Sequence, residues 1–336
     1  MKKSMKRLTI IFVAAIGLGA YEQFSNPFSV AKQAINRLEH SNQDKLAAYR
    51  TDEQKYSDDL IQNPSDHVAG AKAAVALDSK TNKFVYDKNG EKPMKVASLA
   101  KLMTLYLTIQ KAQKENAWNE VVDTSNPGLV KLGNDFELGG FKFKKGHKYT
   151  VRDLYKAALV QSSNNSAIAL GQWVAGNNKK FIQMMNDQAK AWNLNAHFVS
   201  SSGLENSDLG KFGYAQVGSK DDANMVTARS MAEIADHVLS VYPQITDDAK
   251  QVSEQVDGQT VVNENSLLEN RPFYDSSLHV DGLKTGYTEA AGLCLVATGQ
   301  KPGKNRLITV VVNDSSEFSD TAKLMKMVYN QSDQFK

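Results

Sequence analysis

The chain has 336 residues, of which 41% are hydrophobic and 23% are charged, enough for one large or two small globular domains. Its net charge of +3 is too small to indicate nucleic-acid binding, and we recognise no basic stripe interleaved with aromatic residues, so polyanion binding is not expected. The single cysteine, Cys294, can form no intrachain disulfide, and its apolar surroundings (GLCLVATG) favour a small core residue.

The first twenty residues have the pattern of an export signal. A basic segment at 2–7 precedes the uncharged run LTIIFVAAIGLGA at 8–20. That run is shorter than the roughly 20 residues that a membrane-spanning helix needs. The pattern favours a cleaved signal peptide at 1–20 over a retained N-terminal anchor, and it leaves 8–20 as the segment through which any membrane attachment would occur. We therefore expect an exported, extracytoplasmic protein.

The folded domain is expected to follow a stalk. Residues 21–65 are polar and show helical spacing without a dense apolar face, which predicts a partly helical stalk. The domain is expected to span 66–336, because AKAAVALD, the turn-like SKTNK and FVYD predict a β-hairpin from Ala71 onward. Next comes VASLAKLMTLYLTIQKA at 96–112, whose apolar residues repeat at helical spacing and predict a core helix.

More helices and then strands are predicted in the rest of the chain. Thr150 with Asp153 is typical of a capping box that opens the helix VRDLYKAALV. KKFIQMMNDQAKAWN has helical spacing, and Thr227 is expected to cap ARSMAEIADHVLSVY, which Pro243 ends. DGLKT, GLCLVATG and LITVVVN predict strands, followed by a last helix at about 317–330. This order predicts an α+β fold, in which an antiparallel sheet is flanked by helices and contains a mostly helical insert.

Three polar motifs are expected to meet where the helices join the sheet. Ser98-Leu99-Ala100-Lys101 opens the core helix, Ser162-Ser163-Asn164 interrupts two helical runs, and Lys284-Thr285-Gly286 lies on a strand. Each motif alone is common and usually marks a surface turn or a cap. The ordered set, each motif on its expected element, is the combination of penicillin-binding proteins and class A β-lactamases.

The chain resembles the serine-type D-alanyl-D-alanine carboxypeptidases, which are low-molecular-mass penicillin-binding proteins. The resemblance covers about residues 71–329 and includes SSGLEN, TARSMAEIA, NENSLLEN and VVVNDSSEFSDTAKLM. It implies a penicillin-binding/β-lactamase-like transpeptidase fold. The implied substrate is a peptidoglycan stem pentapeptide ending in D-Ala-D-Ala, the implied covalent inhibitors are β-lactams, and the implied location is the cell wall or the outer face of the cytoplasmic membrane.

The chain also departs from the family pattern. Val96 and Ala100 stand where the family usually has proline and threonine, and 207–225 looks like an insertion. The C-terminal β-rich domain and the amphipathic tail of many family members are not expected here.

The chemistry of the first motif follows from its residue types. A serine hydroxyl needs a base, and Lys101, one helical turn from Ser98, is available whereas no histidine is placed for the task. Making an ordinary lysine neutral at pH 7 costs about 4.6 kcal/mol. A second ammonium about 6 Å away at an effective dielectric near 20 supplies about 2.8 kcal/mol of this. Lys284 is the candidate for that charge, and burial is expected to supply the rest.

The resemblance and this chemistry together imply a role for each residue. Ser98 is expected to attack the carbonyl of the penultimate D-alanine while Lys101 accepts its proton, so that an acyl-enzyme forms as D-alanine leaves. Ser162 is expected to relay the proton to the leaving amine, and Asn164 to bind the acyl-side amide and orient Lys101.

Substrate binding is assigned to the strand motif. Lys284, Thr285 and Gly286 are expected to form the substrate-binding strand, and the first two of them to bind the terminal carboxylate. The backbone N–H groups of Ser98 and, by the resemblance, Tyr287 are expected to form the oxyanion hole, worth about 3 kcal/mol per donor. No metal or cofactor is required.

Two other functions remain open. A class A-like β-lactamase needs a glutamate that activates the deacylating water, and the nearest match to E-x-x-L-N is Glu264 in ENSLLEN. A non-catalytic penicillin-binding wall protein would keep the fold without the reaction. The chain contains no G-x-S-x-G motif, and its six scattered histidines form no zinc motif.

Overall fold

The computed structural model describes residues 56–61, 68–135 and 137–335. They belong to one compact unit that starts at Tyr56, before the predicted domain boundary at residue 66. The predicted signal segment and the predicted stalk up to residue 55 lie outside the described residues. None of the helices in these three ranges is long and apolar enough to cross a membrane.

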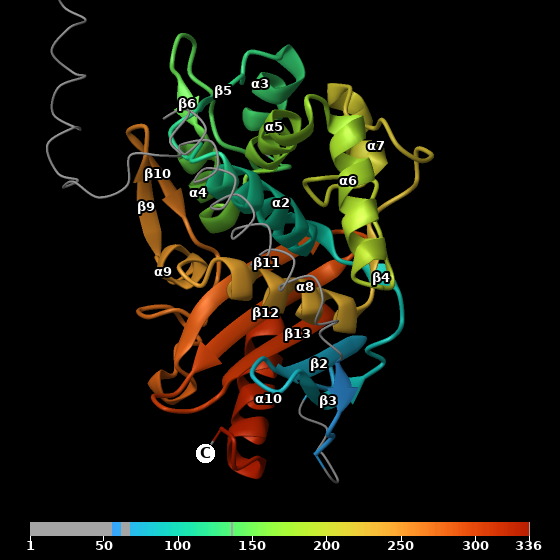
Figure 1. The fold of residues 1–336 in the computed structure, drawn as a ribbon, viewed down its shortest axis with the longest axis vertical. Helices are drawn as coiled ribbons and strands as arrows, with labels where there is room; N and C mark the ends of the chain where they lie inside the picture. Colours follow the sequence, from blue (N-terminus) through green and yellow to red (C-terminus); the bar gives the residue numbers. More distant parts are fainter. Residues whose placement is uncertain (1–55, 62–67, 136, 336) are drawn as a thin grey trace, which may run out of the picture. The chain divides into compact units, whose positions relative to one another are not determined.

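A six-stranded sheet brings together strands from both ends of the compact unit (Figure 1). Its strand order is β1-β3-β2-β13-β12-β11, and each neighbouring pair is antiparallel except β1 with β3. The predicted α+β fold with a hairpin and three C-terminal strands is confirmed. The parallel edge strand β1 was not predicted, because its two exposed polar residues carry no alternating pattern. The strands are β1 (Ser57–Asp58), β2 (Ala73–Asp78), β3 (Lys83–Lys88), β11 (Val280–Thr288), β12 (Gly292–Gln300) and β13 (Arg306–Asp314).

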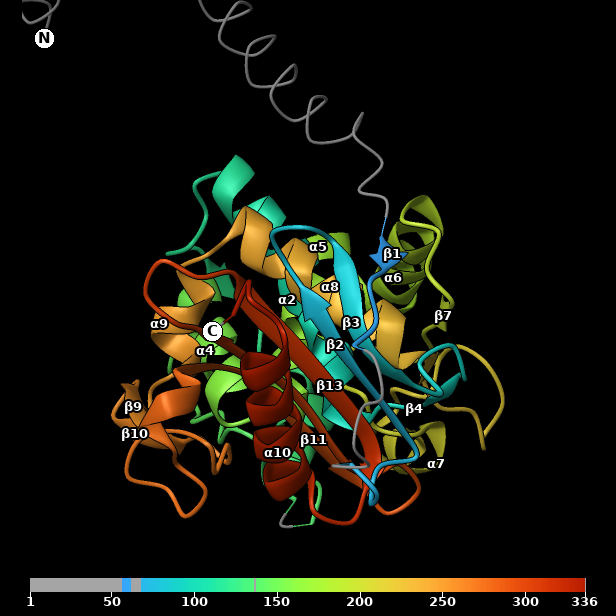
Figure 2. The same ribbon diagram turned by 90° about the horizontal axis from the view of Figure 1, so that it is seen from below.

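Both faces of this sheet are buried, because alternate residues of its central strands enter different cores. In β2, Val75 and Leu77 belong to one core and Ala74 and Ala76 to the other. Helix α8 (Ala228–Val241) packs on β2 and β13 with α2 (Lys101–Lys114) against it, whereas α10 (Glu317–Gln331) covers the opposite face (Figure 2). Burial on both faces explains why these strands read as continuous apolar runs.

The segment between β3 and β11 is mostly helical, as predicted. The Thr150–Asp153 capping box is present, and the Thr227 side chain accepts the backbone N–H of Ser230 at the start of α8. Three small sheets, β4-β8-β7, β5-β6 and β9-β10, brace the helices. The helical elements are η1 (Ala97–Ala100), α3 (Pro127–Gly133), α4 (Val151–Val160), α5 (Asn164–Ala175), α6 (Asn178–Ala191), α7 (Asn206–Leu209), η2 (Gly210–Phe212), α9 (Ile245–Ala249) and η3 (Ser276–Leu278); the short strands are β4 (Met94–Lys95), β5 (Val121–Val122), β6 (Tyr149–Thr150), β7 (Ala196–His197), β8 (Met225–Val226), β9 (Ser253–Val256) and β10 (Gln259–Val262).

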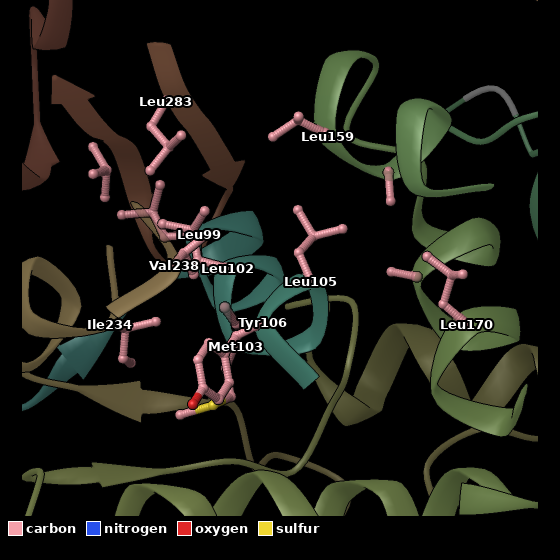
Figure 3. Close-up of a cluster of buried hydrophobic side chains, with 14 of the residues drawn as sticks. Leu99, Leu102, Met103, Leu105, Tyr106, Leu159, Leu170, Ile234, Val238 and Leu283 are labelled. Atoms are coloured by element: carbon pink, nitrogen blue, oxygen red, sulfur yellow. The ribbon is translucent and has the colours of Figure 1, made fainter. Parts of the chain in front are cut away.

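Helix α2 is a core helix, as predicted. Its side chains from Lys101 to Ile109 are all buried, and α4, α5, α6 and α8 pack around it. The turn η1, which leads into this helix, contacts β11, and the helix itself packs on α5. Figure 3 shows the cluster formed by Leu99 and the α2 residues Leu102, Met103, Leu105 and Tyr106 with Leu159, Leu170, Ile234, Val238 and Leu283.

Candidate active site

Ser98 lies on the short 3-10 helix η1, which leads directly into α2. The serine therefore precedes the α-helix, and Lys101 is the first residue of that helix. Ala97 has φ +46°, a left-handed conformation that is uncommon for a residue other than glycine and is often found at functional sites. Gly203 packs against this turn, where a Cβ would lie 2.0 Å from the Ala97 carbonyl oxygen. The backbone at Ser98 is thus fixed by close packing.

The side-chain nitrogen of Lys101 is fully buried and has three oxygen neighbours. Lys101 Nζ lies 2.7 Å from Ser98 Oγ and 2.7 Å from Asn164 Oδ1. It also lies 2.6 Å from the backbone carbonyl oxygen of Ser202. The predicted contact of Ser98 with Lys101 and the predicted contact of Asn164 with Lys101 are therefore both present in the structure.

Burial and a second charge both favour the neutral form of Lys101. Burial lowers the pKa of Lys101 well below its ordinary value, the positive charge of Lys284 lowers it further, and the carboxylate of Glu264 acts in the opposite direction. These are the two causes on which the sequence argument relied. Glu264, which entered that argument only as a match to a β-lactamase motif, also acts on the pKa of Lys284.

The partners of Lys101 determine how a neutral amine would be oriented. Asn164 Oδ1 and the Ser202 carbonyl oxygen carry no hydrogen and can only accept. A neutral amine has two N–H groups and one lone pair, so both of its N–H groups are used by these two acceptors. The lone pair then faces the Ser98 hydroxyl, which can donate its proton along this contact.

Sequence reasoning missed the contribution of Ser202, because its backbone carbonyl rather than its side chain makes the contact. Every residue has a carbonyl, so the sequence carries no signal for this role. Two hydrogen bonds from other segments fix the loop that contains Ser202. Thr104 Oγ1 of α2 donates to the Ser201 carbonyl at 2.7 Å, and Asn224 Nδ2 donates to the Ser200 carbonyl at 2.9 Å.

The second motif connects α4 to α5. Ser162 has φ +62°, Ser163 is the N-cap of α5, and Asn164 is the first residue of that helix. Asn164 Nδ2 donates to the backbone carbonyls of Leu138 and Gly139, so its amide joins Lys101 to the loop before β6. The Asn164 side chain thus contacts Lys101 through its oxygen and the 138–139 loop through its N–H groups, and its orienting role remains a prediction. The relay role of Ser162 and the substrate contact of Asn164 remain predictions.

The third motif lies on β11, the edge strand beside η1. Lys284 is 2% exposed and donates to the Thr285 carbonyl oxygen at 2.9 Å. Burial lowers the pKa of Lys284 to about 8, and Glu264 opposes this shift. Tyr287, whose backbone is a predicted oxyanion donor, is 63% exposed.

Gly286 brings β11 into contact with the serine turn. A Cβ at this position would lie 3.1 Å from the backbone nitrogen of Ser98, which is the other predicted oxyanion donor. The end of β11 is fastened to the neighbouring loop, because Thr288 Oγ1 donates to Glu205 Oε1 at 2.8 Å. The predicted insertion at 207–225 follows this loop and contains η2 and all of α7 except its first residue, Asn206.

The fold and the site together place a serine hydroxyl against the side-chain nitrogen of a buried lysine, beside the edge strand of the sheet. The model of a family described as D-alanyl-D-alanine carboxypeptidase, peptidase family S11, matches residues 60–316. The chain therefore belongs to the D-alanyl-D-alanine carboxypeptidase family, as the sequence resemblance predicted.

Curated relatives carry the same family name. D-alanyl-D-alanine carboxypeptidase DacF of Bacillus subtilis is 29% identical over 265 residues, which cover 77% of this chain and 61% of the relative. DacC of Escherichia coli is 31% identical over 285 residues, which cover 80% of this chain and 63% of the relative. The chain thus spans about three-fifths of the length of these curated relatives.

Solved structures of penicillin-binding proteins have a similar fold. The structure described as a peptidoglycan synthesis regulatory factor (PBP3) from Streptococcus pneumoniae has a TM-score of 0.73 and 33% identity, covering 77% of this chain and 74% of that chain. Penicillin-binding protein D2 from Listeria monocytogenes in its ampicillin-bound form has a TM-score of 0.62 and 28% identity, covering 77% and 96%. The predicted transpeptidase-like fold is confirmed.

Proposed function

We propose that this protein is a serine-type D-Ala-D-Ala carboxypeptidase that removes the terminal D-alanine from peptidoglycan stem pentapeptides through an acyl-enzyme on Ser98. The observation that carries the proposal is the contact of the buried Lys101 Nζ with Ser98 Oγ at 2.7 Å. A lysine whose pKa is lowered by burial can act as a base near neutral pH, which an exposed lysine cannot do.

The reaction proceeds in two steps, acylation of Ser98 and hydrolysis of the acyl-enzyme. Ser98 Oγ bonds to the carbonyl carbon of the penultimate D-alanine and passes its proton to Lys101. The proton then moves by way of Ser162 to the leaving amine as the peptide bond breaks and D-alanine departs. Water next adds to the acyl-enzyme and gives up a proton, and the shortened peptide leaves with a new carboxylate while Ser98 recovers its hydrogen.

The substrate lies along β11 in this proposal. The Lys284 ammonium and the Thr285 hydroxyl bind the terminal carboxylate, which selects a free C-terminus. The backbone N–H groups of Ser98 and Tyr287 hold the developing oxyanion, and each donor is worth about 3 kcal/mol. Gly286 leaves room for this strand to approach the serine turn, since even a methyl group there would contact the turn. Asn164 binds the acyl-side amide of the substrate and keeps its Oδ1 on Lys101.

Location and inhibition are part of the same proposal. The basic segment and apolar run at the N-terminus support export, with a cleaved signal peptide, to the cell wall or the outer face of the cytoplasmic membrane. If the signal is retained, residues 8–20 provide the membrane attachment. The Listeria protein is described in ampicillin-bound and cefotaxime-bound forms, which supports β-lactams as covalent inhibitors of this chain.

The experiment is mass spectrometry of a stem pentapeptide incubated with the protein and with its Ser98→Ala variant. The wild type is expected to release one D-alanine, and the variant none. Fluorescent penicillin should label the wild type stably and leave Ser98→Ala unlabelled. An unchanged pentapeptide with folded, penicillin-labelled protein would point to a non-catalytic wall protein, and rapid loss of the label would point to a β-lactamase.

A further inference from the structure

A short, strongly basic segment follows the loop that contacts Asn164. The sequence FKFKKGHKY at 141–149 contains the four lysines Lys142, Lys144, Lys145 and Lys148, and all four are exposed. We call this segment the basic loop. Its lysines are interleaved with aromatic residues, so the expectation that the chain has no such basic stripe was wrong. None of the motif chemistry described above uses these lysines.

The basic loop is built on an aromatic interior. Phe141, Phe143 and Tyr149 are buried, and the Tyr149 ring centroid lies 5.4 Å from that of Phe141 and 5.3 Å from that of Phe143. The Tyr149 hydroxyl accepts the backbone N–H of Lys144 at 2.8 Å. Because alternate residues turn inward, Lys142 and Lys144 project outward from a shaped loop.

The charges of these lysines are largely uncompensated. Of the ion pairs in the described part of the chain, only one reaches the basic loop, and it joins His147 Nδ1 to Asp257 Oδ2 at 2.8 Å. Lys144 Nζ contacts Asp257 only through the backbone carbonyl oxygen, at 3.4 Å. Asp135 and Glu137 precede the loop, and the Asp135 carboxylate accepts backbone N–H groups of its own turn. The four ammonium groups are therefore available to an external anion.

The basic loop adjoins the wall of the candidate active site. The backbone N–H of Phe141 donates to Asn165 Oδ1 at 3.0 Å, and Phe141 lies two residues after Gly139, whose carbonyl accepts from Asn164. The loop also contacts the β9–β10 hairpin, where Gln259 Nε2 donates to the Lys142 carbonyl oxygen at 3.0 Å. A polymer held on this loop would consequently lie beside the substrate site.

We propose that the basic loop binds a chain-like polyanion that carries phosphate groups. The bound polymer lies next to the substrate site while the enzyme acts on peptidoglycan, so this inference rests on the proposed function. A lysine ammonium binds phosphate as a point charge and needs no fixed orientation, which suits successive phosphates of a flexible chain. A membrane surface fits less well. Loops and helices that bind bilayers add exposed apolar or aromatic side chains for insertion, whereas here the aromatic rings face inward.

The test uses fluorescence anisotropy of dye-labelled inorganic polyphosphate with the full chain. Four neutralised phosphates predict a salt slope of about −2.8, so the affinity should fall about 50-fold between about 50 and 200 mM salt. Replacing all four lysines of the loop by glutamine should weaken binding at least tenfold. The matched control makes the same charge change at four exposed lysines elsewhere and should bind as the wild type does: Lys92, Lys179, Lys180 and Lys190.

Three results would overturn the proposal. One is an equal loss of polyphosphate affinity in the loop variant and the control variant, which would show that only the net charge of the protein matters. Another is equally tight binding of poly-L-glutamate, which would remove the assignment to phosphate. The third is loop-dependent binding to vesicles containing phosphatidylglycerol without binding to polyphosphate. These readouts are independent of the proposed peptidase activity, and the loop variant should hydrolyse a soluble pentapeptide at the wild-type rate.

Discussion

The substitution Lys284→Arg tests whether the second buried lysine works through its charge. Lys284 binds a carboxylate in the proposed mechanism, so it must be an ammonium, whereas Lys101 must be neutral. The acylation rate should therefore rise as pH increases through the pKa of Lys101, which gives the pH–rate profile a rising limb. It should fall as pH increases through the pKa of Lys284, which is about 8, and this gives the profile a falling limb. A guanidinium stays charged at every accessible pH. The falling limb should consequently disappear in Lys284→Arg.

The size of the effect follows from the pKa of Lys284. At pH of about 9.5 a group with a pKa of about 8 keeps about 3% of its protons, so wild-type acylation should be about 30-fold below its plateau. Lys284→Arg should lose less than about twofold over the same interval. At neutral pH the variant should be within about tenfold of the wild type, because arginine keeps the charge and can bind a carboxylate.

The assay is the second-order rate constant for acylation by a fluorescent penicillin, measured across the pH range with thermal unfolding as the control for folding. Lys284→Gln is the matched variant. Removing the charge should raise the pKa of Lys101, so the rising limb should move to higher pH. A falling limb that stays near pH 8 in Lys284→Arg would refute the assignment of that limb to Lys284.

Three further predictions concern the base, the strand contact and the N-terminal edge. Lys101→Arg should lose at least about 1,000-fold in acylation rate, because a guanidinium cannot accept the proton at neutral pH; substantial remaining activity would place the base elsewhere. Gly286→Ala should lower acylation at least about tenfold in stopped-flow labelling without unfolding the protein. Gly210→Ala should not, because the added Cβ would meet only the Ala215 Cβ, at an ordinary contact distance of 3.9 Å; equal rates would remove the argument from close approach. A fragment starting at residue 66 should be active but about 1–3 kcal/mol less stable in urea unfolding than one starting at Tyr56, because it lacks the Tyr56 hydroxyl that donates to the buried Asp236 at 2.9 Å. Equal stability of the two fragments would show that residues 56–65 contribute nothing to the free energy of unfolding.

Local sequence signals determined most of the secondary structure. The apolar spacing of α2, the capping box at Thr150 and the cap at Thr227 act within a few residues, so they can be recognised without knowledge of the fold. The long apolar runs of β12 and β13 likewise identified buried strands. The three motifs predicted the residues of the candidate site because each combines residue types with a required local element.

Tertiary structure decided which atoms meet. Segments far apart in sequence meet in the contact of Lys101 with the Ser202 carbonyl and in the hydrogen bond from Thr288 to Glu205. The same holds for Glu264, whose charge acts on the pKa values of both Lys101 and Lys284. The two polar residues of β1 likewise pair with β3 without any pattern that predicts it. Apolar periodicity reports which face of an element is buried, but not which other element covers it. Backbone groups, present at every residue, acquire a role only when packing brings a particular one within hydrogen-bond distance of a side chain.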